Sequence, residues 1–377
     1  MLRQFCRLYL QPAPDDSTLI RWAGFIEPDT LEQLNEHVVK LARQLRVTRG
    51  RKLRTDPTVV ETNISYPRDS GLLRDGVRVI SRVITRAKEL VGTSIQNART
   101  VFRNRTSSAK RLARQIADEA RRRGQEAEAG RRATYQRLLK ITEATLKQAE
   151  TVQVLLQEGL AEESAAAVRR LQESLDQFVP LVKQVVTQTR RRVLEGEMVP
   201  ATEKLVSIFE PHTQIIRRGK GYKQTEFGRK VSLDEVDGGI VSRYRVLEGN
   251  PTDDGEAPAS LANHQRVFAR PPNLFAGDRG VYSAENEVAA HQIGVKQVVL
   301  PQPGHKTKER KSHERQSWFR RGMRFRAGIE GRINVLKRRG NLGRCRDHGE
   351  TGFGRWVGWG IMVANLQTIA RTRAARS

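Results

Sequence analysis

The sequence predicts a mixed α/β fold in which a β-sheet domain is interrupted by a long helical segment. Three changes of pattern along the 377 residues indicate this. A β-rich stretch covers 51–64, a helical pattern with few breakers covers 77–207, and strand patterns return after Pro211. Because strands and helices alternate in the last part, we expect one mixed sheet with crossover helices.

The chain is therefore divided into four parts: an N-terminal helical segment (1–50), the first part of the sheet domain (51–76), a helical insertion (77–207), and the remainder of the sheet domain with a C-terminal helix (208–377). In the first part, the polar cluster 15–18 and Pro28 are typical helix starts. Two interpretations of this segment remain open: a truncated DNA-binding module, or a plain helical pair that covers the core.

The first predicted strand carries an acidic side chain, Asp56. β-branched residues surround it, including Thr58, Val59 and Val60, and such residues favour strands. Pro57 follows directly, and proline lacks the N–H that a neighbouring strand would accept. A proline there is normally confined to a sheet edge or a bulge.

The helical segment shows a stripe of apolar residues spaced by three and four, which predicts a helix that buries one face and is kinked at Pro180. The stripe consists of Val168, Leu171, Leu175, Phe178, Val182 and Val185. The arginine runs 121–123 and 190–192 are interpreted first as solvated surface and second as a surface that guides DNA.

The second half of the sheet domain alternates between strands and helices. A hairpin is predicted around Asp237-Gly238-Gly239, with strands on both sides. The elements expected after it are a helix (260–268), a strand (274–278), a helix (284–291), a strand (295–300) and a helix that carries Glu330. The basic segment 306–315 is expected to be a mobile loop that contacts phosphates.

The composition indicates a polyanionic partner. Lys and Arg outnumber Asp and Glu by 68 to 42, which gives a formal charge of +26. Charge alone does not separate DNA, RNA and an acidic membrane, but no apolar run reaches the roughly 20 residues of a membrane span. Only two cysteines occur, so no disulfide framework is indicated and a reducing cytoplasm is expected.

Two acids are placed at strand positions that can share one edge of the sheet. Asp278 follows a predicted strand that can lie parallel to the strand of Asp56, and the helix of Glu330 can fold back over the same edge. Converging carboxylates raise one another's pKa unless cations neutralise them, and Mg²⁺ or Mn²⁺ prefers such oxygens. The competing interpretation of Glu330 is an ordinary (i, i+4) ion pair with Arg326 on a solvated helix.

A combination of short motifs resembles the DDE transposases of bacterial insertion sequences, in particular the ISNCY-type group. The matching segments are 53–56 with 59–63, 209–212, 226–230, 277–280, and Arg326-x3-Glu330-x6-Lys337. One departure is Met323, which stands where the related signature has a tyrosine.

This resemblance implies an RNase H-like catalytic fold in which the helical segment is an insertion. It implies that Asp56, Asp278 and Glu330 are catalytic and hold two Mg²⁺ or Mn²⁺ ions, about 3.5–4 Å apart in such sites. Arg326 and Lys337, flanked by Arg324 and Arg338, are then contacts to DNA.

The implied activity is metal-dependent cleavage at transposon ends followed by strand transfer into target DNA. The partners would be these two DNAs, bound by a homodimer or larger oligomer, with no membrane partner and a cytoplasmic, nucleoid-associated location. The alternatives are a non-catalytic basic DNA-binding protein and a degenerate transposase that binds without cutting. Convergence of the three acids separates these hypotheses.

Overall fold

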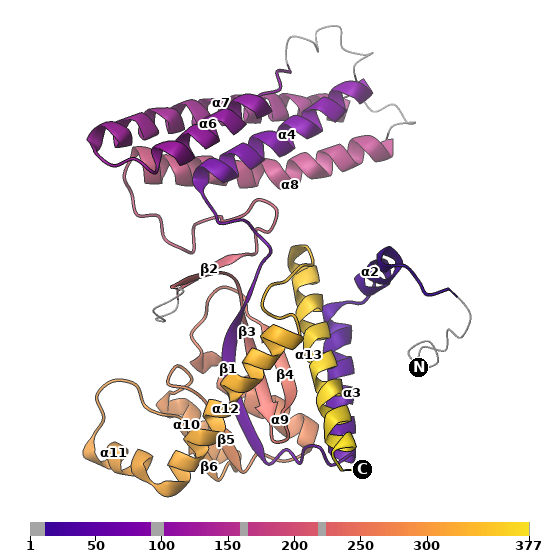
Figure 1. Cartoon of the computed structure of the whole chain (residues 1–377), viewed down its shortest axis with the longest axis vertical. Helices are drawn as coiled ribbons and strands as arrows, with labels where there is room; N and C mark the ends of the chain where they lie inside the picture. The colour runs from indigo at the N-terminus through magenta and orange to yellow at the C-terminus, as the bar shows by residue number, and fades with distance from the viewer. Residues whose placement is uncertain (1–11, 92–101, 159–164, 218–223, 377) are drawn as a thin grey trace. The chain divides into compact units, whose positions relative to one another are not determined.

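The computed structural model in Figure 1 describes residues 12–91, 102–158, 165–217 and 224–376. The chain forms two compact units, each with its own hydrophobic core. The sheet unit comprises the described residues of Met1–Asn63 and Ile216–Ser377, and the helical unit comprises those of Ile64–Ile215. The fold is therefore mixed α/β, as predicted.

The sheet has six strands and mixed direction. The strands are β1 (Lys52–Glu61), β2 (Gln214–Arg217), β3 (Thr225–Val236), β4 (Ile240–Val246), β5 (Leu274–Ala276) and β6 (Gln297–Val299). Their order is β2-β3-β1-β5-β6, and β4 pairs with β3 as the predicted hairpin. β1 lies between antiparallel β3 and parallel β5, so it is an interior strand.

Pro57 is tolerated in this interior strand because its backbone nitrogen points toward β5, and β5 has already ended at this level of the sheet. The carbonyl of Lys52 accepts a hydrogen bond from the N–H of Asp237, which follows β3, and the N–H of Thr62 donates to the carbonyl of Phe227 in β3. The backbone N–H and C=O groups of even-numbered residues in β1 therefore point toward β3. Pro57 therefore faces β5, whose pairing with β1 stops at Arg54. No ladder hydrogen bond is lost, so this proline is accommodated inside the sheet without an edge or a bulge.

Seven α-helices among the described residues belong to the sheet unit. They are α2 (Asp16–Gly24), α3 (Pro28–Gln44), α9 (Ala257–Phe268), α10 (Ala284–Gln292), α11 (Lys308–Arg315), α12 (Ser317–Arg339) and α13 (Gly349–Ala374). A 3₁₀ turn, η3 (Asp254–Glu256), precedes α9. α3 and α13 run side by side and both pack on β4 (Figure 1). α3 is thus part of the sheet unit's core.

α12 and α9 cover opposite faces of the sheet. Phe319 of α12 packs with Leu274, Ala276 and Val299. The alternate strand residues, such as Phe275, pack on the other face with residues of α9 and α10. This arrangement places the helix that carries Glu330 on the face toward which Arg54 and Asp56 of β1 also point.

Most of the segment 306–315 belongs to helix α11, which begins at Lys308, so the prediction of a loop was wrong. The hydroxyl of Thr307 caps the helix by accepting from the N–H of Arg310. Arg310 then forms ion pairs with Glu287 at 2.7 Å and with Glu314 at 3.0 Å. The charges in this stretch are therefore partly compensated within the protein.

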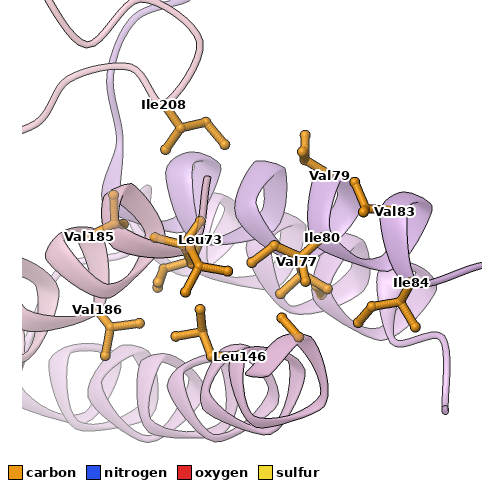
Figure 2. Close-up of a cluster of buried hydrophobic side chains, with 14 of the residues drawn as sticks. Leu73, Val77, Val79, Ile80, Val83, Ile84, Leu146, Val185, Val186 and Ile208 are labelled. Atoms are coloured by element: carbon orange, nitrogen blue, oxygen red, sulfur yellow. The ribbon is translucent and has the colours of Figure 1, made fainter. Parts of the chain in front are cut away.

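The helical unit consists of α4 (Asp69–Val91), α6 (Thr106–Glu119), α7 (Gln125–Glu158), α8 (Ala165–Thr189) and a π-helical turn, η2 (Arg190–Leu194). Figure 2 shows its core, in which Leu73 and Val77 of α4 face Leu146 of α7 and Val185 of α8. The predicted apolar stripe of α8 is buried, with Phe178 partly so, and Pro180 lies inside this helix. α4 begins at Asp69, within the range assigned above to the sheet.

Cys345 is buried in the hydrophobic cluster between the sheet and α13, and its thiol donates to the carbonyl of Asp347 at 3.4 Å. Its role is packing. Cys6 lies outside the described residues. None of the helices in the described ranges combines the length and apolar character needed to cross a bilayer.

Candidate carboxylate site

The pairing register places Asp56 and Asp278 at the same level of the sheet. Arg54 of β1 is opposite Ala276 of parallel β5. Asp56 lies two residues after Arg54 and is still inside β1. Asp278 lies two residues after Ala276 and is just beyond the end of β5. The sequence-predicted convergence of these two acids is therefore what the backbone produces.

Asp278 begins a tight turn after β5. Its Oδ1 accepts hydrogen bonds from the N–H groups of Gly280 at 2.8 Å and Val281 at 3.2 Å. Such a turn fixes the direction of the carboxylate without using any other side chain. Its other oxygen forms no hydrogen bond to the described residues.

A third aspartate, Asp253, lies next to Asp278. A Cβ placed on Gly280 would be 2.9 Å from Oδ2 of Asp253 and 3.2 Å from Oδ1 of Asp278, so both carboxylates border this glycine. Lys230 of β3 approaches Asp253 at 3.0 Å. Sequence reasoning missed Asp253 because it sits in a loop before η3, where no strand or helix periodicity marks it.

Arg326 of α12 reaches down onto the sheet between two of the predicted acids. Its Nη2 lies 3.6 Å from Oδ2 of Asp56, and its Nη1 lies 3.4 Å from Oε1 of Glu330. The Arg326 side chain is only 18% exposed, whereas that of Glu330 is 68% exposed. The (i, i+4) ion pair is therefore present, and it extends to Asp56.

Burial raises the pKa of Asp56 to about 7. Arg326 acts in the opposite direction, and the negative charges of Asp278, Asp253 and Glu330 raise the pKa of Asp56 further. All three acids are thus close enough to Asp56 to affect its ionisation. One guanidinium does not balance this group of carboxylates, and additional positive charge would stabilise the ionised form of Asp56.

A buried ion-pair network holds α12 against the sheet beside this site. Glu235 of β3 is almost completely buried, and it forms ion pairs with Arg54 of β1 at 2.7 Å and with Arg332 of α12 at 3.4 Å. Arg54 also donates to the carbonyl of Phe325 in α12. The sequence did not single out this network, because its three charged groups lie on three different elements.

The other cationic residues of the prediction lie elsewhere on α12. Arg324 and Arg338 are exposed, and Lys337 is half-buried. Met323 packs against the hydrophobic cluster around Phe319, below the same helix. Among the predicted DNA contacts, Arg326 lies within ion-pair distance of Asp56 and Glu330.

The side chains of this site are of the type that binds divalent cations, but they are not grouped closely enough to hold one. Aspartate and glutamate oxygens are the ligands that Mg²⁺ and Mn²⁺ prefer, and burial together with the neighbouring carboxylates raises the pKa of Asp56. However, no three Asp, Glu, His or Cys side chains of the described residues are grouped closely enough to hold a metal ion. The Arg326 guanidinium instead lies within ion-pair distance of both Asp56 and Glu330.

Comparison with models of protein families, with curated proteins and with solved structures found no match to this chain.

Proposed function

We propose that this protein is a DDE-type transposase that cleaves DNA at transposon ends and transfers the freed strand into target DNA. The observation that carries the proposal is the register that sets Asp56 of β1 level with Asp278, just beyond the end of the adjacent parallel strand β5, with Arg326 linking Asp56 to Glu330. The motif resemblance over the same residues supports it. The formal charge of +26 suits a DNA partner.

We further propose that the sheet unit is an RNase H-like catalytic domain into which the helical unit is inserted. The central strand β1, its antiparallel neighbour β3 and its parallel neighbour β5 support this fold, as does the position of the helical unit in the chain between β1 and β3. Oligomerisation on DNA is part of the same proposal, since both ends of an element must be processed.

In this proposal Asp56, Asp278 and Glu330 would hold the catalytic ions. Mg²⁺ or Mn²⁺ bound there would supply the activation of a water or 3′-hydroxyl and the stabilisation of the leaving oxygen. The pKa of Asp56, raised to about 7, leaves this carboxyl partly protonated near neutral pH, and added positive charge would favour its ionised form. Asp253 contributes further negative charge beside Asp278.

The decisive experiment compares Asp278→Asn with the wild type in a nicking and joining assay on DNA that carries the element's own terminal repeats. We expect activity to fall about 100-fold or more, because metal ligation contributes several kcal/mol to the transition state. DNA binding should be retained. Glu285→Gln, an exposed acid on α10, is the matched control and should leave activity unchanged.

Equal cutting by wild type and Asp278→Asn would rule out the proposed site. A second candidate function, DNA binding without cutting, is favoured by the absence of a three-acid group among the described residues and by the place of Arg326 between Asp56 and Glu330. That candidate predicts that the wild type binds the repeats in the same assay but does not nick them with either metal.

A further inference from the structure

The helical unit contains a pocket of about 470 Å³ that the catalytic proposal does not use. It lies between the start of α4, the end of α6, the beginning of α7 and η2. Four arginines line it: Arg68, Arg121, Arg131 and Arg192. The arginines at 121 and 192 come from the two runs that the sequence marks as basic surface.

Most of this positive charge is not compensated by the protein. Asp69 is the only acid in the lining, and its carboxylate is buried, with Oδ2 3.1 Å from Arg192 and Oδ1 accepting from Gln188. The side chains of Arg68, Arg121 and Arg131 make no ion pair or hydrogen bond with the described part of the chain. Guanidinium groups gathered in this way suit a phosphate, which accepts paired N–H donors.

The remaining wall of the pocket is aromatic and apolar. Tyr66 is 75% exposed at its rim, and Tyr135 is half-buried and hydrogen-bonded to Ser70. Small apolar side chains at the end of α6, including Ala117 and the C-cap residue Ala120, complete the lining. Arginines that hold a phosphate beside an aromatic ring that stacks on a base are the usual elements of single-strand recognition.

We propose that this pocket binds one unpaired nucleotide of a DNA strand, with its phosphate against Arg68 and Arg121 and its base against Tyr66. The cavity has room for a single nucleotide but not for a base pair within a double helix. The proposal rests on the proposed function insofar as it assumes a DNA partner. It assigns the helical unit a separate role, which is to recognise distorted or single-stranded DNA.

The test uses the full chain and two fluorescent duplexes of equal length, one fully paired and one with a single unpaired nucleotide. Binding is measured by anisotropy at one salt concentration. We expect the wild type to favour the second duplex about 10-fold, and we expect Tyr66→Ala and the double variant Arg68→Gln/Arg121→Gln each to abolish that preference. These three residues are exposed, so their replacement should leave the fold intact, as circular dichroism can verify.

The matched control is Arg169→Gln/Arg170→Gln, which removes the same charge from an exposed part of α8. It should weaken binding of both duplexes equally and keep the preference. The proposal is overturned if the pocket variants behave like this control. It is also overturned if the pocket variants lose the binding of inorganic phosphate, measured by calorimetry, but keep the preference for the duplex with the unpaired nucleotide.

Failure here and failure of the catalytic proposal are distinguishable. A wild type that cuts transposon ends but does not prefer the unpaired nucleotide would remove the pocket's role alone. If the wild type prefers the unpaired nucleotide but Asp278→Asn cuts as well as the wild type, only the proposal for the catalytic site is contradicted.

Discussion

Asp56 is a carboxylate buried inside a central strand, and its surroundings favour the protonated form. Burial is the main cause, and three neighbouring acids add to it against the single opposing charge of Arg326. A residue that is unfavourable for the folded state in this way is often retained for function rather than for stability.

This balance sets the direction of a stability change with pH. The folded-state pKa of about 7 lies above the ordinary value of 3.8, so between these values the folded protein binds more protons than the unfolded chain. The free energy of unfolding therefore falls as pH rises from about 4 to about 7. The contribution of Asp56 is most favourable below pH 4 and is lost above pH 7.

Asp56→Asn should remove that loss. We expect the free energy of unfolding of the variant, relative to that of the wild type, to increase by up to about 3 kcal/mol as the pH rises from 5 to 8, measured by urea unfolding. Added Mn²⁺ should narrow the difference at pH 8, because a bound cation stabilises the ionised carboxylate of the wild type only. Parallel pH profiles for the two proteins would contradict the raised pKa.

At the scale of a single element, α12 positions the site because it packs closely on the sheet. Gly322 faces Val299 so closely that a Cβ would lie 2.4 Å from a methyl carbon of that side chain. Gly331, on the same helix, is exposed and has open space around it. One glycine is needed for the close approach and the other is not.

These two glycines make a matched pair of substitutions. Gly322→Ala should lower the free energy of unfolding by about 1–3 kcal/mol through overpacking. Gly331→Ala should raise it by about 0.5–1 kcal/mol, since alanine favours a helix over glycine. Urea melts of both variants test this. Similar shifts of the same sign would show that α12 does not pack on β6 as described.

Arg326 shows where helical periodicity is insufficient for assigning a role. Helical spacing places it near one face with Glu330 and Lys337, and it places Ile329 and Ile333 on another face that can pack inward. Arg326 and Ile333 are seven residues apart, which is nearly two turns, so Arg326 lies at the border of the apolar stripe. The structure shows it turned toward Asp56. Which way a border residue points depends on the surface beneath the helix.

At the scale of the whole molecule, the sheet unit and the helical unit have separate hydrophobic cores. Leu175 of α8 is fully buried in the helical unit, and Leu53 of β1 is fully buried in the sheet unit. Because no core is shared, damage to one core should be felt mainly within its own unit.

Leu175→Ala should destabilise the helical unit by about 2–5 kcal/mol while leaving the sheet unit's amide protection unchanged. Hydrogen exchange followed by mass spectrometry distinguishes the two sets of amides. Leu53→Ala is the reciprocal variant and should affect only the sheet unit. Equal loss of protection in both units from either variant would show that they unfold together.

Many of the local elements and the positive charge of this protein follow from the sequence alone. Apolar spacing predicted the buried stripe of α8, β-branched residues predicted β1, and the turn at Asp237 predicted the hairpin, because each depends on neighbours within a few residues. Composition likewise indicated a polyanionic partner. These properties do not depend on how distant segments meet.

Only the tertiary structure decided which side chains share a site. It placed Asp253 beside Asp278, directed Arg326 at Asp56, and aimed Pro57 toward the side where β5 has ended. Strand register and helix packing bring together residues that are hundreds of positions apart, and local periodicity carries no record of such pairings.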